Sequence, residues 1–359
     1  MTEACDRCLT RAWLIGRLAG HLDYARGRID SVLALADEDL IAAFGGDRAR
    51  ALRRERDSVD LEAMRDRSRA AEMELLCRCH ASYPVSLRAL AGAPAVLYVA
   101  GGVGRFLTLV AKDPVAIVGA RAASPYGVGV ARSLGGSLAR AGVSVLSGMA
   151  HGIDSAAHVG ALEARAPTIA VLPGPADRPY PTSRRALHRR LVATGAAVSE
   201  VPPGTSVRRW MFPARNRIIA ALAAMTVVVE AGERSGSLVT AAFAQRLGRR
   251  VGAVPGQITR PQAAGSNALL ANGATVVRGP QDVLDALFGV GVRAAADDDR
   301  PELSEELALL LAGLADGHGT STALIRAGYE PDEGLAALAS LELAGYVRRE
   351  AGGRFAVIP

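Results

Sequence analysis

Between residue 114 and about residue 290, short apolar runs alternate with stretches of helical spacing. These runs have the length of strands, and near-continuous apolar strands indicate burial on both faces of a sheet. Because helical stretches separate most of the runs, the pattern predicts an α/β fold with a mostly parallel sheet covered by helices on both faces. The predicted strands are 115–118, 143–147, 168–172, 196–199, 225–230, 251–254 and 274–277.

The region before this pattern is predicted to be helical. Apolar residues recur at helical spacing through Leu14, Leu18 and Leu22, which predicts a small helical module over residues 1–82. This module either contacts a nucleic-acid backbone or only packs against the rest of the chain. The main domain is predicted to cover 83–290 and to begin with a connector that contains a short strand at 96–99.

A third domain is predicted at residues 302–359, after an exposed linker at 291–301. Helices are expected at 303–314, 322–327 and 332–344, followed by a hairpin that turns at Gly352-Gly353. This order is typical of a winged helix-turn-helix. The third helix contains neither arginine nor lysine, which favours a protein-contact or structural role over binding in a DNA groove.

Three predicted strands run into glycine- and hydroxyl-rich turns that open helices. The segments are VAIVGARAASPYG (115–127), VLSGMAHGIDSAAH (145–158) and VVVEAGERSGSLVT (227–240). Unpaired N–H groups and the positive end of the helix dipole favour an anion at such a turn, and glycine permits its close approach. In a parallel sheet all three turns lie at the carboxyl ends of the strands, where ligands bind.

The charge of the chain permits a polyanionic partner. The chain has 359 residues, half of them hydrophobic, and a net charge of +6, so two or three globular domains are expected. Its basic residues are arginines except for Lys112, a bias that a GC-rich genome would also produce. Clustering is more informative, because nine arginines and one acid, Glu200, lie between Arg178 and Arg217. Arginine binds phosphate through two parallel hydrogen bonds.

Several enzyme classes lack their sequence signatures. Gly119-Ala120-Arg121 does not have the spacing of a dinucleotide-binding turn, and the second strand ends in Ser147-Gly148 without the acid that binds ribose. A Walker-type NTPase needs a lysine in the loop that follows a strand, but the sole lysine, Lys112, precedes the first strand of the α/β region, which excludes this class. Ser147 in L-S-G and Ser235 in R-S-G do not lie in the G-x-S-x-G motif of a nucleophile elbow. His151, Asp154 and His158 form either a metal or acid–base group, or a helix cap with a buried histidine.

These exclusions leave a site that binds phosphate without cleaving it. Arg121, Arg215 and Arg217 would supply positive charge, and several adjacent anion sites suit the consecutive phosphates of a single nucleic-acid strand. Such sites usually add aromatic side chains that stack on bases. The candidate hydroxyl groups are those of Ser124, Ser147, Ser235, Ser237 and Thr240, and the candidate aromatic residues are Tyr126, Tyr180, Trp210 and Phe212.

The four cysteines are candidate ligands of a structural zinc ion. Cys5 and Cys8 form a C-x-x-C pair, and Cys77 and Cys79 form a C-x-C pair that is followed by His80. His21 is a further candidate. The alternative is that these cysteines are reduced thiols without a metal. Disulfides are not expected, because the N-terminus lacks a signal-peptide pattern and the chain is predicted to be cytoplasmic and not inserted in a membrane.

The chain resembles the DprA/Smf family (DNA-processing protein A) over about residues 83–285. The segments VGARAASPYG, SGMAHGIDSAAHVGAL, FPARNRIIAAL, VVVEAGERSGSLVTAAFA and VPGQITRPQAAGSNALLANGA follow one another in the family's order. The resemblance implies an extended Rossmann-like domain that binds single-stranded DNA in a basic pocket, forms homodimers and loads the recombinase RecA during natural transformation. It implies no catalytic activity. The helical N-terminal and winged-helix-like C-terminal modules are also similar to arrangements in the family.

The resemblance also implies a set of DNA-binding residues. Two departures concern it: Ala214 stands where the family often has an arginine, so some phosphate affinity is expected to be missing, and the loop containing Leu172-Pro173-Gly174 and Ser183 differs from the common pattern. The implied residues are Gly119, Arg121, Ser124, Tyr126 and Gly127 in the first turn, Ser147, Gly148, Gly152, Asp154 and His158 in the second, and Arg215, Asn216, Arg217, Glu230, Ser235, Gly236, Ser237, Thr240, Pro255, Gly256 and Asn267 beyond them.

Two alternatives to a DNA-binding function remain open. One is a nucleotide phosphoribohydrolase of related architecture. Such enzymes carry a P-G-G-x-G-T-x-x-E turn, whereas VEAGERSGSLVT lacks the adjacent glycine pair. The other is an adaptor that binds mainly another protein through the C-terminal module.

Overall fold

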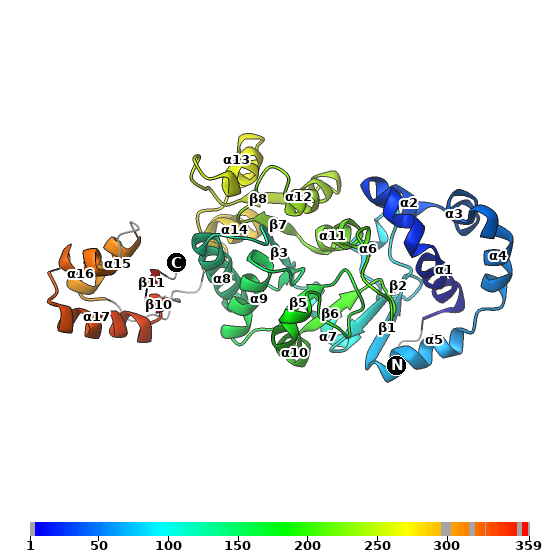
Figure 1. Cartoon of the computed structure of the whole chain (residues 1–359), viewed down its shortest axis with the longest axis horizontal. Helices are drawn as coiled ribbons and strands as arrows, with labels where there is room; N and C mark the ends of the chain where they lie inside the picture. The colour runs from blue at the N-terminus through cyan, green and yellow to red at the C-terminus, as the bar shows by residue number, and fades with distance from the viewer. Residues whose placement is uncertain (1–3, 296–302, 316–319, 327, 350–353, 358–359) are drawn as a thin grey trace.

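A nine-stranded sheet forms the centre of the described part of the chain, as Figure 1 shows. The computed structural model describes residues 4–295, 303–315, 320–326, 328–349 and 354–357. The strand order is β1-β2-β6-β5-β4-β3-β7-β8-β9; the first two neighbouring pairs are antiparallel and the others parallel. The strands are β1 (Met73–Cys77), β2 (Val96–Ala100), β3 (Val115–Val118), β4 (Val145–Ser147), β5 (Thr168–Val171), β6 (Ala196–Ser199), β7 (Met225–Val228), β8 (Arg250–Ala253) and β9 (Thr275–Val276).

The predicted α/β fold with a mostly parallel sheet is confirmed. Each predicted strand is present, with ends that differ by at most two residues. The prediction missed β1, because this segment was assigned to the helical module at residues 1–82. The segment Met73-Glu74-Leu75-Leu76-Cys77 is rich in residues that favour helices, and its pairing with β2 overrides this local preference. The domain boundary at residue 82 remains a prediction. β1 lies before this boundary but belongs to the sheet.

Helices cover both faces of the sheet. In β3, Val115 and Ile117 belong to one apolar cluster with α8, α9 and α14, whereas Ala116 and Val118 belong to another with α7, α11 and α12. This alternation follows from the two-residue period of a strand and explains why β3 is apolar throughout. The covering helices are α6 (Val85–Arg88), α7 (Val103–Val110), α8 (Pro125–Arg140), α9 (Ile153–Glu163), α10 (Arg185–Thr194), α11 (Met211–Leu222), α12 (Gly236–Arg246), α13 (Ala264–Ala271) and α14 (Pro280–Phe288).

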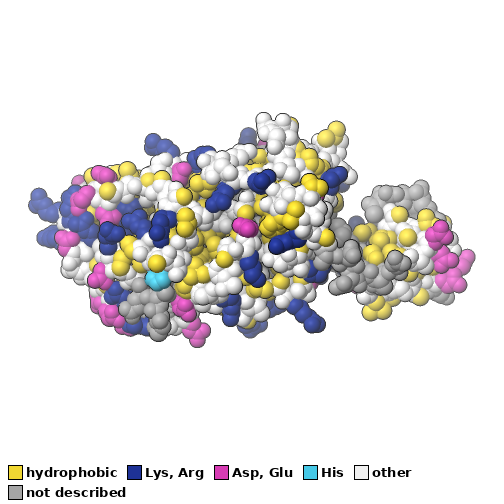
Figure 2. All heavy atoms as spheres, turned by 180° about the vertical axis from the view of Figure 1, so that it is seen from behind, with side chains coloured by type: hydrophobic (Ala, Val, Ile, Leu, Met, Phe, Trp, Pro, Cys, Tyr) yellow, Lys and Arg dark blue, Asp and Glu magenta, His cyan; other side chains and the backbone are white. Residues whose placement is uncertain are grey.

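The N-terminal helices pack against α11 through a buried apolar cluster. Leu14, Leu18 and Leu22 of α1 share this cluster with Trp210 and Ala214. Many arginines of these helices form ion pairs with neighbouring acids, and Figure 2 shows basic and acidic side chains intermixed at this end of the molecule. This pairing favours the packing role over contact with a nucleic-acid backbone. The helices are α1 (Asp6–Leu22), α2 (Ile29–Ala34), α3 (Asp37–Phe44), α4 (Ala49–Asp57) and α5 (Leu61–Ala70).

The described C-terminal residues form three helices and an antiparallel strand pair. The elements are α15 (Glu305–Ala315), α16 (Thr320–Arg326), α17 (Pro331–Leu343), β10 (Val347–Arg349) and β11 (Phe355–Val357), in the predicted order. Leu310, Leu338 and Val347 are buried in their shared core. The winged-helix-like arrangement remains a prediction; the turn at Gly352-Gly353 and most of the linker at 291–301 lie outside the described residues. Among the described helices, none has both the length and the hydropathy to cross a membrane.

Candidate functional site

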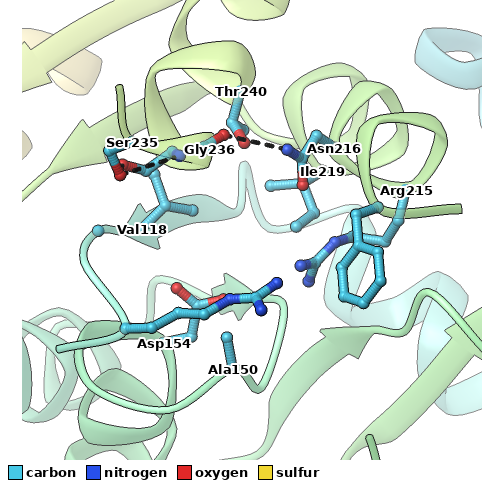
Figure 3. Close-up of a pocket in the computed structure, with 13 residues that line it drawn as sticks. Val118, Ala150, Asp154, Arg215, Asn216, Ile219, Ser235, Gly236 and Thr240 are labelled. Atoms are coloured by element: carbon cyan, nitrogen blue, oxygen red, sulfur yellow. Dashed lines mark hydrogen bonds between the residues drawn. The ribbon is translucent and has the colours of Figure 1, made fainter. Parts of the chain in front are cut away.

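The three glycine turns meet at one edge of the sheet, as predicted. They follow β3, β4 and β7, which are neighbours in the order β4-β3-β7 and run parallel, so their carboxyl ends coincide. A cavity of about 200 Å³ opens between these turns and α11, as shown in Figure 3. Its lining residues are Val118, Gly119, Arg121, Ala150, Asp154, Phe212, Arg215, Asn216, Ile219, Ser235, Gly236, Ser237 and Thr240. We call this cavity the main pocket.

Glu230 joins the first turn to the end of β7. The backbone N–H of Ser124 donates to Glu230 Oε2 at 2.7 Å, and that of Ala120 donates to the Glu230 carbonyl at 2.7 Å. Ser124 in turn caps α8 by accepting from the Gly127 N–H at 3.1 Å. These polar groups are therefore used within the fold. Their contacts indicate that Glu230 and Ser124 shape the pocket.

The second turn depends on two glycines. A Cβ on Gly148 would fall on the Arg215 guanidinium group, so this guanidinium reaches the turn only because position 148 has no side chain. Gly152 has φ = +72°, a conformation that favours glycine, and a Cβ there would overlap the Ala120 carbonyl of the first turn. Asp154, in the first turn of α9, accepts from the Gly148 N–H at 3.1 Å. The two turns are thus packed backbone to backbone.

One face of α11 forms the opposite wall of the main pocket. Phe212, Arg215, Asn216 and Ile219 lie at positions i, i+3, i+4 and i+7 and therefore share a face. Figure 3 shows Arg215 extending from this helix into the pocket, while Asn216 faces the start of α12. Arg215 Nη1 donates to the Val171 carbonyl at 3.0 Å, and Asn216 Nδ2 donates to the Gly236 carbonyl at 3.2 Å. These bonds hold both polar side chains in place.

Arg217 points away from the main pocket, although Arg215 and Asn216 line it. Two residues along a helix correspond to a rotation of about 200°. Arg217 is 1% exposed and forms a two-pronged ion pair with Glu200, with N–O distances of 2.7 and 3.0 Å. It also donates to the Gly92 carbonyl at 2.8 Å. The family resemblance implied a DNA contact for Arg217, but its hydrogen bonds and ion pair support a structural role.

The start of α12 brings three hydroxyl groups to the main pocket. Ser235 caps the helix and lies 2.7 Å from Ser237 between their Oγ atoms. Thr240 lies one turn further along and also lines the cavity. A helix N-terminus with hydroxyl donors favours an anion, because unpaired N–H groups and the helix dipole carry partial positive charge there.

A second cavity of about 170 Å³ adjoins the main pocket and has aromatic walls. The two cavities share Arg121, Ala150, Phe212 and Arg215. The rings of Tyr180 and Phe212 meet edge to face with centroids 5.4 Å apart, and the Arg121 guanidinium lies 5.0 Å from the centre of the Phe212 ring. Gly148, His151, Pro173 and Pro181 complete the lining. We call this cavity the aromatic pocket.

The charges in the main pocket act on one another. Burial raises the pKa of Asp154, and the positive charge of Arg215 opposes this rise. Burial lowers the pKa of Arg215; Asp154 opposes this effect, whereas the nearby charge of Arg121 adds to it. Both guanidinium groups border the main pocket, where their like charges repel each other. An anion bound between them would relieve this repulsion and would add charge-assisted hydrogen bonds.

The structure separates the predicted site residues into two groups. Gly119, Arg121, Asp154, Arg215, Asn216, Ser235, Gly236, Ser237 and Thr240 line the main pocket, and Gly148 lines the aromatic pocket. The others surround these cavities or lie in the core. The Ser147 hydroxyl donates to the Ile117 carbonyl at 2.6 Å, and the Asn267 side chain pairs with the backbone of Gly256 at 3.0 and 3.1 Å. The residues that do not line either cavity are Ser124, Tyr126, Gly127, Ser147, Gly152, His158, Arg217, Glu230, Pro255, Gly256 and Asn267.

The implied site residues did not include Phe212, His151 or Ile219. Phe212 was a candidate only as one of four aromatic residues. Of the other three, Tyr180 lines the aromatic pocket, Trp210 is buried in the core, and Tyr126 is exposed with its hydroxyl 3.3 Å from the Pro255 carbonyl. The spacing 212, 215, 216 and 219 was the available signal, because it marks one helix face. The same spacing places Ala214 outside this helix face, and Ala214 is fully buried among the N-terminal helices.

His158 is expected to make the stability of the protein depend on pH. It is fully buried, its Nδ1 lies 2.8 Å from Thr168 Oγ1, and burial followed by the charge of Arg215 lowers its pKa to about 3, from 6.5. As the pH falls, His158 of the unfolded chain binds a proton before His158 of the folded protein does. The contribution of neutral, buried His158 to stability is therefore fully present above about pH 6.5 and is lost as the pH drops toward 3. The loss in unfolding free energy is expected to reach about 1.4 kcal/mol per pH unit.

Urea unfolding of wild type and His158→Asn across this pH range measures the effect of His158. Asparagine keeps a hydrogen-bond donor but cannot be protonated, so the two stability curves should converge as the pH falls. The pKa of His188 is also lowered by burial, and this contribution cancels because both proteins contain His188. Parallel curves would contradict the assignment.

Comparison with known proteins identifies the family. The family described as DNA recombination-mediator protein A matches residues 74–288. The DNA processing protein DprA of Mycobacterium tuberculosis is 41% identical over 259 residues, which are 70% of this chain and 66% of that protein, so the match spans slightly less than two thirds of the relative. The X-ray structure of DprA from Streptococcus pneumoniae covers 80% of this chain and 98% of that chain, with a TM-score of 0.65 and 30% identity.

A second solved structure is that of DNA processing protein A from Helicobacter pylori, described for its single-stranded DNA binding mode. It covers 60% of this chain and 95% of that chain, with a TM-score of 0.54 and 28% identity. The family match spans more than half of the chain and includes the three glycine turns, α11 and both cavities. The resemblance noted from the motifs is thereby confirmed, and the chain belongs to the DNA recombination-mediator protein A family, DprA/Smf.

Proposed function

We propose that this protein is a non-enzymatic single-stranded DNA-binding protein that protects incoming DNA and passes it to RecA during natural transformation. The observation that carries the proposal is the pair of adjoining cavities that share Arg121 and Arg215. The main pocket offers two guanidinium groups and a helix N-terminus to a phosphate. The aromatic pocket offers Tyr180 and Phe212 to a base. Phosphate and base alternate along a nucleic-acid strand, and unstacked bases stack on aromatic side chains.

The contacts around the pocket favour binding without catalysis. Ser147 and His158, the residue types that would serve as nucleophile and base, are both fully buried. The Ser147 hydroxyl is bonded to the Ile117 carbonyl and His158 to Thr168. Asp154 is buried and bonded to the Gly148 N–H, so its carboxylate is used to hold the second turn. Release of a free base from a nucleoside monophosphate would instead support the phosphoribohydrolase alternative.

Titration of a labelled oligonucleotide at several salt concentrations tests DNA binding. We expect tighter binding of the single strand than of the duplex, because bases in a duplex are stacked and cannot enter the aromatic pocket. Each phosphate contact should contribute about 0.7 to the slope of log K against log salt concentration. Equal affinity for single and double strands would contradict the proposal.

The proposed partners are RecA and a second copy of the chain. Both proposals rest on family membership, which also supports a cytoplasmic location. Capture of RecA by the full chain, and by the chain without residues 302–359, tests whether the C-terminal domain takes part. Sedimentation of the full chain tests for the homodimer. Absence of RecA binding would contradict the first partner, and a purely monomeric protein would contradict the second. Neither result depends on the DNA titration.

A further inference from the structure

Three cysteines that are far apart in the sequence converge at the edge of the sheet. Cys5 and Cys8 lie at the start of α1, and Cys79 lies in the turn after β1. Their Sγ atoms are all within 4.8 Å of one another, and the distance between the Sγ atoms of Cys8 and Cys79 is 3.6 Å. All three are free thiols. Such a group is a candidate metal site, because thiolates are preferred ligands of zinc.

The spacing of the sulfur atoms agrees with tetrahedral coordination. Zn–S bonds of about 2.3 Å place two sulfur ligands of a tetrahedral ion about 3.8 Å apart. The Cys8–Cys79 distance is close to this value, and the 4.8 Å limit for the other pairs requires only a small inward movement. Cys5 and Cys8 have the C-x-x-C spacing typical of zinc sites, and the backbone N–H of Cys8 donates to the Cys5 carbonyl at 3.0 Å.

We propose that Cys5, Cys8 and Cys79 bind one zinc ion that joins the start of α1 to the end of β1. Three thiolates and Zn²⁺ carry a net charge of −1. Arg7 offsets this charge, because its Nη2 lies 3.2 Å from the Sγ atom of Cys79. Cys79 is exposed, so a water molecule completes the coordination from the solvent side. The site is separate from both DNA-binding cavities.

The structure assigns Cys77 a different role from the other three cysteines. Cys77 is in β1 and, like Cys8, is buried in the apolar cluster that contains Leu9, Ala12 and Tyr98. It is not part of the group of mutually close ligand atoms. The four-cysteine site considered from the sequence is thereby reduced to three cysteines, and Cys77 provides a matched control.

Metal analysis of the full chain tests the proposal. Protein expressed with added zinc and purified under reducing conditions should contain about one zinc ion per chain. Cys79→Ser, which alters an exposed residue, and Cys5→Ser should lose the metal, whereas Cys77→Ala should retain it. Cobalt(II) added to the metal-free chain should give the visible absorption of tetrahedral thiolate-bound cobalt, and Cys79→Ser should abolish it.

Three results would overturn the zinc site. They are wild-type protein without zinc and without a cobalt spectrum, zinc that persists in Cys79→Ser, and a Cys8–Cys79 disulfide found by mass spectrometry in protein purified with reductant. The wild-type measurements do not depend on any variant, so a variant that fails to fold leaves the proposal testable.

Discussion

Alanine in place of Arg215 is expected to weaken the binding of single-stranded DNA by about 10- to 150-fold. The reason is that Arg215 borders both cavities and would donate charge-assisted hydrogen bonds to a phosphate at their junction. Hydrogen bonds to charged groups contribute about 1.5–3 kcal/mol, and about 1.4 kcal/mol corresponds to tenfold in affinity. Fluorescence titration of an oligonucleotide measures the change. The affinity of Arg215→Lys should lie between those of wild type and Arg215→Ala, because lysine keeps the charge but lacks the planar fork.

Two further variants separate the pocket from general effects of charge. Arg121→Ala removes an exposed guanidinium from the same two cavities and should also weaken binding, without disturbing buried packing. Arg50→Ala removes the same charge from an exposed position of α4, outside the pocket, and should leave affinity within about twofold of wild type. Unchanged binding in both Arg121→Ala and Arg215→Ala would contradict the assignment of the pocket.

Alanine in place of Arg217 is expected to lower the free energy of unfolding by about 3–5 kcal/mol, the range for breaking a buried ion pair by removing one partner. The pair with Glu200 has side-chain exposures of 1% for Arg217 and 9% for Glu200, so the remaining carboxylate would be mostly buried without its partner. The Gly92 carbonyl would also lose its donor. Urea unfolding measures the loss.

The double variant Arg217→Met with Glu200→Leu provides the control for this prediction. It removes both charges and fills a similar volume, so the part of the loss that comes from the unpaired carboxylate should return, whereas the Gly92 carbonyl still lacks its donor. Arg217→Ala that remains folded at low temperature should bind single-stranded DNA about as well as wild type. A stability loss below about 1 kcal/mol, or DNA binding that is lost in the folded variant, would contradict the structural role of Arg217.

The contrast between Arg215 and Arg217 shows how far local sequence patterns reach. Both arginines belong to one motif, and the family resemblance implied the same role for them. The helix rotates by about 200° between the two positions, so one borders the pocket and the other the core. The period of the helix was readable in the sequence, but the face of α11 that meets the turns was not, since it depends on packing against the sheet.

The expected effect of Ala214 changes for the same reason. An arginine missing from this position suggested a loss of phosphate affinity. In the structure Ala214 is fully buried with Leu14, Leu18 and Trp210, so the position contributes to packing between α11 and the N-terminal helices. A long charged side chain at this place would meet the apolar cluster and neither of the two cavities.

Local sequence patterns were enough to predict the α/β arrangement, the strands from β2 to β9 and the meeting of three glycine turns at one edge of the sheet. These features follow from local periodicity, and from the rule that parallel strands end on the same side of a sheet. Four features became visible only in three dimensions: the pairing of β1, the aromatic wall of Tyr180 and Phe212, the different surroundings of Arg215 and Arg217, and the convergence of Cys5, Cys8 and Cys79. Each of these depends on contacts between segments far apart along the chain, whose geometry is set by packing rather than by local preference.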